Sequence, residues 1–312
     1  MNSKQRFPGH KHSQLVKGQV IASFGRQYEV KTSDGLILVC SMRGKKGGIA
    51  CGDQVEILPT TPNQGVIEAV LPRVNLFYRS DAFRQKLIAA NVSQLIIVVA
   101  VIPSFNETLI DHYLVAAENE GIQVLIILNK CDLSEEMDTA ARKIAQYRQL
   151  GYPCLDMSAV NDIQPLMPHL YQKRSLLIGQ SGMGKSTIIN ALIPEARRAT
   201  KEISLALDSG RHTTTHARLY AIDVDSTIID SPGMQEFGIS HIDKTNLARG
   251  FIEFRPYLGG SCKFSNCRHL SEPGCALLLA AEKGEISTRR LSVYQKMMEE
   301  AGRRKEWLAR SS

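Results

Sequence analysis

The sequence is poor in aromatic residues and has no apolar run long enough to cross a lipid bilayer. Phe, Trp and Tyr make up 6% of the 312 residues, with one tryptophan. The most apolar stretch, residues 95–102, is far shorter than the roughly 20 residues that a membrane-spanning helix needs. The first six residues are polar and basic, so we expect neither a secretory signal nor a membrane partner.

The sequence also lacks the even set of cysteines that marks a disulfide framework. Seven cysteines in an enzyme-sized chain fit a reducing cytoplasm, in which thiols are free or bind metal. Lys and Arg (38) exceed Asp and Glu (31), which gives a formal charge of +7. This excess is compatible with a nucleic-acid partner but does not require one. The 43% apolar content supports the cores of two or three domains.

Residues 14–72 predict a small β-barrel that follows a flexible basic arm (residues 1–13). Five short runs separated by Gly, Asp, Asn and Pro are expected as strands, and the OB-fold is the common barrel of this size. The loop at residues 43–48 contains Arg43, Lys45 and Lys46. It could follow the phosphates of an RNA chain or be an ordinary solvated loop. Stacking partners are sparse (Phe24 and Tyr28), so base-specific readout is not supported.

After a cation-rich connector (residues 73–93) with no readable structure, strand and helix patterns alternate through residues 94–240. Buried strands are expected at residues 95–102, 124–128, 154–157 and 175–178, and amphipathic helices at residues 107–120 and 135–150. Such alternation is typical of an α/β domain with a parallel sheet covered on both faces.

Residues 179–186 have the composition of a phosphate-binding loop. They follow a short strand and precede the helical run 187–192, so glycine N–H groups and the positive end of the helix can face phosphates. Lys185 can reach the β- and γ-phosphates, and the Ser186 hydroxyl can bind Mg²⁺. The expected nucleotide-binding residues here are Gly179, Gln180, Ser181, Gly182, Met183, Gly184, Lys185, Ser186 and Thr187. The alternative is a chance glycine-rich turn.

A guanine-binding motif precedes that loop. Asn129, Lys130 and Asp132 follow the strand at residues 124–128. The Asp132 carboxylate can accept both guanine N–H donors, for which adenine has no counterpart. The alternative is that Asp132 or Ser134 caps the following helix. Ser158 and Ala159 follow the next strand, and the Ala159 N–H could meet guanine O6.

The Mg²⁺ and γ-phosphate elements come after the phosphate loop. Asp230, at the end of a hairpin-like strand, can hold Mg²⁺ through water, and the Gly233 N–H can meet the γ-phosphate. A threonine from the polar segment 196–216 could complete the Mg²⁺ shell. The guanine-binding motif therefore precedes the phosphate loop and the Mg²⁺ and γ-phosphate elements, whereas in the usual GTPase order it comes last. A circular permutation of a P-loop GTPase domain produces the order seen here.

Four soft ligands lie within fourteen residues near the C-terminus. Cys262, Cys267, His269 and Cys275 have the composition of a closed, structural zinc site. The alternative is three scattered thiols and a surface histidine. Cys40, Cys51, Cys131 and Cys154 are expected as buried small residues. Residues 241–312 are therefore expected as a zinc-binding, mainly helical domain. Its helix at residues 287–300 packs on the core, and its basic tail either touches RNA or protein or frays.

Together these motifs resemble the RsgA (YjeQ) family of circularly permuted GTPases, over nearly the whole chain. The resemblance implies hydrolysis of GTP to GDP, slow in isolation and stimulated by the small (30S) ribosomal subunit. It also implies a role in late assembly of that subunit through 16S rRNA binding, by a cytoplasmic protein that we expect to be a monomer.

The same resemblance implies roles for individual residues. Family members lack the glutamine that orients water in other GTPases, and Met234 stands at that position here. The family's substitute maps to His212, which could equally be a solvated loop residue. Thr214 would bind Mg²⁺ together with Ser186. Gly182 stands where some related GTPases use an asparagine to hold K⁺, so a potassium requirement is left open.

Two other functions remain open from the residues alone. A P-loop kinase or ATPase would use Lys185 and Ser186, but the guanine motif argues against it. An RNA-binding module could hold nucleotide only for stability, but Lys185, Ser186 and Asp230 are all present, which argues against that.

Overall fold

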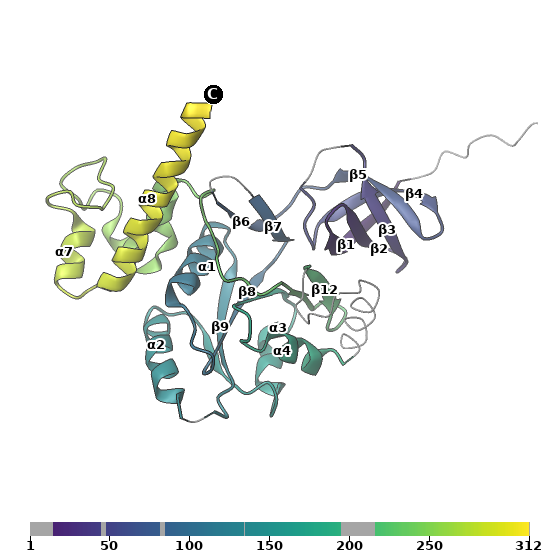
Figure 1. Cartoon of the computed structure of the whole chain (residues 1–312), viewed down its shortest axis with the longest axis horizontal. Helices are drawn as coiled ribbons and strands as arrows, with labels where there is room; N and C mark the ends of the chain where they lie inside the picture. Colours follow the sequence, from purple (N-terminus) through teal and green to yellow (C-terminus); the bar gives the residue numbers. More distant parts are fainter. Residues whose placement is uncertain (1–14, 45–47, 82–84, 134, 195–215, 312) are drawn as a thin grey trace, which may run out of the picture.

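The chain forms a β-barrel, a central α/β unit and a helical C-terminal unit (Figure 1). The computed structural model describes residues 15–44, 48–81, 85–133, 135–194 and 216–311, with backbone alone from residue 302. Within these ranges no helix has the length and apolarity to cross a membrane.

Five strands form the predicted barrel: β1 (Val16–Phe24), β2 (Gln27–Thr32), β3 (Ile37–Met42), β4 (Gln54–Thr61) and β5 (Gln64–Val70). The order β1-β2-β3-β5-β4 closes because β1 also pairs with β4. Side chains alternate between the interior and solvent, as in β2, where Tyr28, Val30 and Thr32 are buried. Residues 45–47 of the basic loop lie outside the described residues, and Arg43 forms an ion pair with Glu68.

The central sheet has the strand order β10-β9-β8-β11-β13-β12. It is built from β8 (Gln94–Ala100), β9 (Gln123–Asn129), β10 (Cys154–Asp156), β11 (Arg174–Ile178), β12 (Arg218–Ala221) and β13 (Thr227–Asp230). All neighbours from β10 to β13 are parallel, and β12 is antiparallel to β13. The carboxyl ends of the parallel strands therefore share one edge, which brings separate sequence motifs together.

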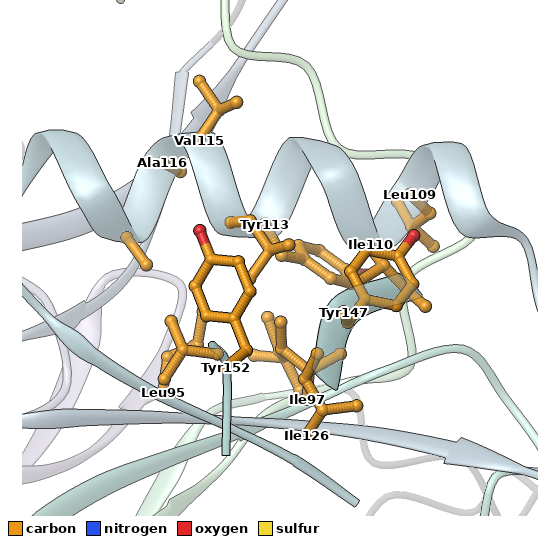
Figure 2. Close-up of a cluster of buried hydrophobic side chains, with 14 of the residues drawn as sticks. Leu95, Ile97, Leu109, Ile110, Tyr113, Val115, Ala116, Ile126, Tyr147 and Tyr152 are labelled. Carbon is orange, nitrogen blue, oxygen red and sulfur yellow. The ribbon is translucent and has the colours of Figure 1, made fainter. Parts of the chain in front are cut away.

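Helices cover this sheet on both faces. On one face α1 (Glu107–Asn119) packs Leu109, Ile110 and Tyr113 onto Leu95, Ile97 and Ile126 of β8 and β9 (Figure 2). The other helices of this unit are α2 (Met137–Gln149), α3 (Met167–Leu170), which follows the 3₁₀ turn η1 (Gln164–Leu166), and α4 (Lys185–Leu192). The strands and helices predicted by periodicity in this unit are confirmed, with their ends shifted by at most two residues.

The connector between the barrel and the sheet is a hairpin that the sequence did not predict. Its strands are β6 (Leu76–Ser80) and β7 (Gln85–Ala90). Ser80 also bridges to Ile239, where the Ser80 N–H donates to the Gly238 carbonyl (2.9 Å). The strands are short and their polar residues do not alternate regularly, so periodicity gave no signal.

The C-terminal unit contains α6 (Lys244–Leu247), the 3₁₀ segments η2 (Ala248–Gly250) and η3 (Ile252–Tyr257), α7 (Ala276–Glu282) and α8 (Thr288–Ser311). The predicted core positions Leu291, Tyr294, Met297 and Met298 of α8 are buried. The helix continues beyond the predicted end at residue 300 through the basic tail, because Arg, Lys, Glu, Ala and Leu there are strong helix formers.

Buried charges join α8 to α1. The fully buried Asp111 carboxylate accepts bonds from Arg290 (2.5 Å), which is 1% exposed, and from Arg289 (2.7 Å). Arg290 also pairs with Glu253, and the Tyr147 hydroxyl donates to Asp111 (3.1 Å). Breaking such a pair by removing one partner costs about 3–5 kcal/mol, so the two units are held in a fixed relation.

Candidate nucleotide-binding site

The phosphate loop lies in the middle of the sheet's carboxyl edge, between the ends of β8 and β13. Gly179 (φ +149°) passes so close to β8 that a Cβ there would lie 2.2 Å from the Val98 carbonyl oxygen. A Cβ on Gly184 (φ +95°) would lie 2.2 Å from the Asn129 side-chain nitrogen. Both positions require glycine for conformation and for space. The loop then enters α4 at Lys185, two residues before the helical run predicted at residues 187–192.

Lys185 is folded back into the loop that it follows. Its ammonium donates to the carbonyl oxygens of Gly179 and Gln180, both at 2.8 Å, and the residue is 7% exposed. Burial lowers the pKa of Lys185 to about 8, and the charge of Asp230 opposes that shift. A cation held in this way has lost much of its hydration, so an anionic group in the loop would gain strongly from its charge.

Asn129 connects three of the predicted nucleotide-binding segments. Its side-chain N–H donates to the carbonyl oxygen of Met183 (3.0 Å), and its side-chain oxygen accepts from the Ala159 N–H (3.0 Å). The residue is 2% exposed. Its role here is to hold the phosphate loop and the Ser158–Ala159 turn at fixed positions. The Ala159 N–H is engaged with Asn129, and its contact with guanine O6 stays a prediction.

Lys130 and Asp132 lie at the surface beyond Asn129. Lys130 has a left-handed backbone (φ +63°), and its ammonium donates to the Ile102 carbonyl (2.8 Å). Asp132 is exposed, and α2 begins later, with Glu136 as its N-cap. The alternative that Asp132 caps this helix is therefore wrong. The Asp132 carboxylate is thus accessible three residues after Asn129, which bonds to the phosphate loop, and its contact with guanine stays a prediction.

The segment that follows β13 (Thr227–Asp230), residues 231–238, lies against the phosphate loop and is called the Gly233 segment below. Asp230 is buried at the end of β13, opposite Leu177 of β11. A Cβ on Gly233 would lie 3.1 Å from the Ser181 nitrogen. The Met234 N–H donates to the Gly179 carbonyl (3.2 Å), and the Met234 side chain is 7% exposed in the hydrophobic core. Met234 is thus a packing residue and does not reach the solvent side, where a water would be oriented.

Other predicted residues divide between exposed positions and positions outside the described ranges. Ser186 and Thr187, in the first turn of α4, are exposed, and Ser158 is half-buried. His212 and Thr214 fall within residues 195–215, which lie outside the described residues. The sequence reasoning missed Asn106, whose backbone N–H donates to the Gln180 side chain (2.9 Å) and whose side chain caps α1. An asparagine directly before an amphipathic helix is the signal that could have found it.

The four predicted zinc ligands converge on one point. The ligand atoms of Cys262, Cys267, His269 and Cys275 lie within 4.8 Å of one another. His269 Nδ1 is 3.5, 3.6 and 3.3 Å from the sulfurs of Cys262, Cys267 and Cys275. Tetrahedral zinc with bonds of about 2.0 and 2.3 Å places neighbouring N and S ligand atoms roughly 3.5 Å apart. The donors therefore fit Zn²⁺ as a closed structural site, and the Ala276 N–H donates to Cys262 (3.3 Å).

Two of the four remaining cysteines differ from expectation. Cys40 and Cys51 are buried as predicted, whereas Cys131 and Cys154 are only half-buried. Both lie at the β9–β10 side of the sheet, and β10, with only three residues, is the edge strand there.

Comparisons with known proteins agree with this geometry. The sequence profile described as RsgA GTPase matches residues 70–240. The "Small ribosomal subunit biogenesis GTPase RsgA" of Nitrosomonas europaea is 56% identical over 94% of each chain. The protein of the same name from Ralstonia pickettii is 46% identical over 96% of this chain and 98% of its own.

Solved structures show the same architecture. The crystal structure of YjeQ from Thermotoga maritima is 32% identical, with a TM-score of 0.69 over 92% of this chain and 99% of its own. YloQ, described as a circularly permuted GTPase, is 27% identical, with a TM-score of 0.66 over 95% and 99%. The profile match over more than half of the chain and the relatives at 46–56% identity show that the chain belongs to the RsgA GTPase family.

Proposed function

We propose that this chain hydrolyses GTP at the sheet edge formed by residues 129–132, 158–159, 179–187 and 230–233, and that it does so in the biogenesis of the small ribosomal subunit. The observation that carries the proposal is the convergence of a phosphate loop, a guanine motif and an Asp-x-x-Gly loop on one edge. The family and the names of its relatives support the ribosomal role.

Each protein group has a defined task in this proposal. The loop N–H groups and Lys185 hold the β- and γ-phosphates, where their charge stabilises the transition state. Asp132 accepts the guanine N–H donors, and Lys130 covers the ring. The Gly233 N–H binds the γ-phosphate. His212 orients the attacking water in place of the absent glutamine.

The metal ions have separate tasks. Ser186 and Thr214 would hold Mg²⁺, with Asp230 acting through water. Mg²⁺ bound there would supply positive charge that neutralises the phosphates. Cys262, Cys267, His269 and Cys275 would hold Zn²⁺ as a structural ion with no part in the reaction, because a four-ligand site has no position for water. We also propose that the protein is a cytoplasmic monomer whose barrel contacts 16S rRNA. The net charge of +7 and the family support this proposal.

Turnover measured with and without purified small ribosomal subunits tests this function. We expect slow GTP hydrolysis by the chain alone and a large increase on adding small subunits, because hydrolysis in assembly factors is useful only on the particle. Large subunits are the control and should leave the rate near its basal value. An unchanged rate with small subunits would remove the coupling to the ribosome while leaving the GTPase assignment intact.

Replacing Asp132 by asparagine is expected to change the preferred base. Loss of a carboxylate that accepts two hydrogen bonds should weaken GTP binding by about 10- to 100-fold. An asparagine N–H can instead donate to the 2-oxo group of xanthine, so xanthosine triphosphate should bind better than it does to wild type. Competition binding with GTP, ATP and xanthosine triphosphate measures this. Asp138→Asn, an exposed aspartate in α2, is the matched control. Unchanged guanine preference in Asp132→Asn would show that Asp132 is not the residue that recognises the base.

The pKa of Lys185 predicts a pH dependence of nucleotide binding. In the free protein this pKa is about 8, and bound phosphates must raise it because they favour the cation. Binding therefore takes up a proton above pH 8, and the dissociation constant for GDP should rise by up to about tenfold per pH unit there. Below pH 7 Lys185 is protonated in both the free and the bound protein, so it adds no pH dependence to GDP binding. Titrations from pH 7.0 to 8.5, where guanine N1 keeps its proton, test it, with Lys185→Arg, whose charge persists, as the pH-insensitive control.

A further inference from the structure

Three successive residues of the phosphate loop contact three successive residues of the Gly233 segment. Gly179 accepts from the Met234 N–H (3.2 Å), Ser181 lies against Gly233, and the Gln180 side chain meets Gln235. The first two contacts involve the backbone. Gln180 contributes its side chain, which bonds to Asn106 and Gln235.

The Gln180 amide group has a fixed orientation. Its oxygen accepts from the Asn106 backbone N–H at 2.9 Å, and a backbone N–H can only donate. The amide nitrogen must therefore point the other way, where it donates to the Gln235 side-chain oxygen at 3.3 Å. One half-buried side chain thus joins the phosphate loop, the N-cap residue of α1 and the Gly233 segment.

We infer that Gln180 is a positioning residue that holds the Gly233 segment ready for a γ-phosphate and so sets the preference for GTP over GDP. The inference rests on the proposed function, in which the Gly233 N–H binds that phosphate. Gly233 is exposed and is followed directly by Met234 and Gln235, the two residues attached to the loop. Without the bond to Gln235, the Gly233 backbone has more conformational freedom. GTP binding must then order this backbone, which weakens the binding of GTP.

The far side of the segment is already anchored. Arg79 of β6 donates to the Glu236 carbonyl (2.9 Å), and the Ser80 N–H donates to the Gly238 carbonyl (2.9 Å). The Gln180–Gln235 bond thus lies at the nucleotide end of a segment whose other end is fixed on the β6–β7 hairpin. GDP has no γ-phosphate, and its binding should not depend on this bond.

A double-mutant cycle with Gln180→Met and Gln235→Met tests the inference. Methionine keeps the length of glutamine without the amide, and Gln235 is exposed, so its replacement should not impair folding. Dissociation constants for GDP and for a non-hydrolysable GTP analogue give a ratio for each protein. We expect each single variant to weaken analogue binding relative to GDP by about twofold to tenfold. The double variant should lose no more than the larger single effect.

Three results would overturn the inference: an unchanged ratio in Gln235→Met, equal weakening of both nucleotides, or effects that multiply in the double variant. Gln149→Met, an exposed glutamine at the end of α2, is the matched control and should leave the ratio unchanged. The proposed function fails separately, through absent guanine-nucleotide binding or absent turnover in wild type. A normal wild type with an unchanged ratio rejects only the role of Gln180.

Discussion

Replacing Lys185 by alanine is expected to lower GTP turnover by about 100- to 1000-fold, the loss found when one preorganised charge-stabilising donor is removed. The Lys185 ammonium is buried and held by two loop carbonyl oxygens at 2.8 Å, so its position is fixed before nucleotide arrives. The positive charge is therefore already inside the loop when charge develops on the phosphates. Single-turnover hydrolysis with saturating GTP measures the effect.

Lys173→Ala is the matched control for this variant. Lys173 immediately precedes β11, at the opposite end of the strand that leads into the phosphate loop, and its ammonium donates to Gln123. Its removal should leave turnover within about twofold of wild type, as expected for a surface substitution away from the site. A Lys185→Ala protein that is folded, as judged by circular dichroism, and hydrolyses GTP at the wild-type rate would show that the activity arises elsewhere. The chain would then fit an RNA-binding module that holds nucleotide for stability.

Replacing Cys275 by serine is expected to lower zinc affinity by more than about 100-fold. That value is the upper end of losses caused by residues that only support a metal ligand, and Cys275 would itself be a ligand. The loss removes folding free energy, because structural zinc sites bind with about 10–16 kcal/mol in small domains. Residues 259–274 should become protease-sensitive, and zinc content should fall from one to near zero per chain.

Cys154→Ser separates this effect from general loss of a thiol. Cys154 is half-buried in β10 and has no part in the cluster, so its replacement should retain one zinc per chain. Basal GTP turnover should stay within about twofold of wild type in both variants if zinc is structural, whereas stimulation by small subunits should fall in Cys275→Ser alone. A loss of basal turnover that zinc addition restores would contradict a purely structural site.

Features that depend on residues close together in the sequence were predicted correctly. The five barrel strands, the parallel strands and the four zinc ligands follow from periodicity or ligand spacing, which depend on neighbours in the sequence. The β6–β7 hairpin was not predicted, because its strands are short and their polar residues do not alternate regularly. The Asp111–Arg290 pair was not predicted, because its two residues are 179 positions apart in the sequence. Asn129 illustrates the same limit. Its place at the end of a strand was predicted, but its bonds to Met183 and Ala159 depend on how the fold brings these segments together. The domain limits and the roles of His212 and Thr214 stay predictions.

The bonds between α1 and α8 set the order in which the chain can fold during its own synthesis. Asp111 is made early, whereas its partners Arg289 and Arg290 follow 178 and 179 residues later. The barrel has all its strands within the first quarter of the chain and can fold while translation continues. Until α8 has left the translating ribosome, the nucleotide-binding unit lacks the two arginines that neutralise its buried Asp111 carboxylate. A chain stopped before α8 should therefore contain a folded barrel and an unstable site, so that only a fully translated copy becomes competent to bind nucleotide.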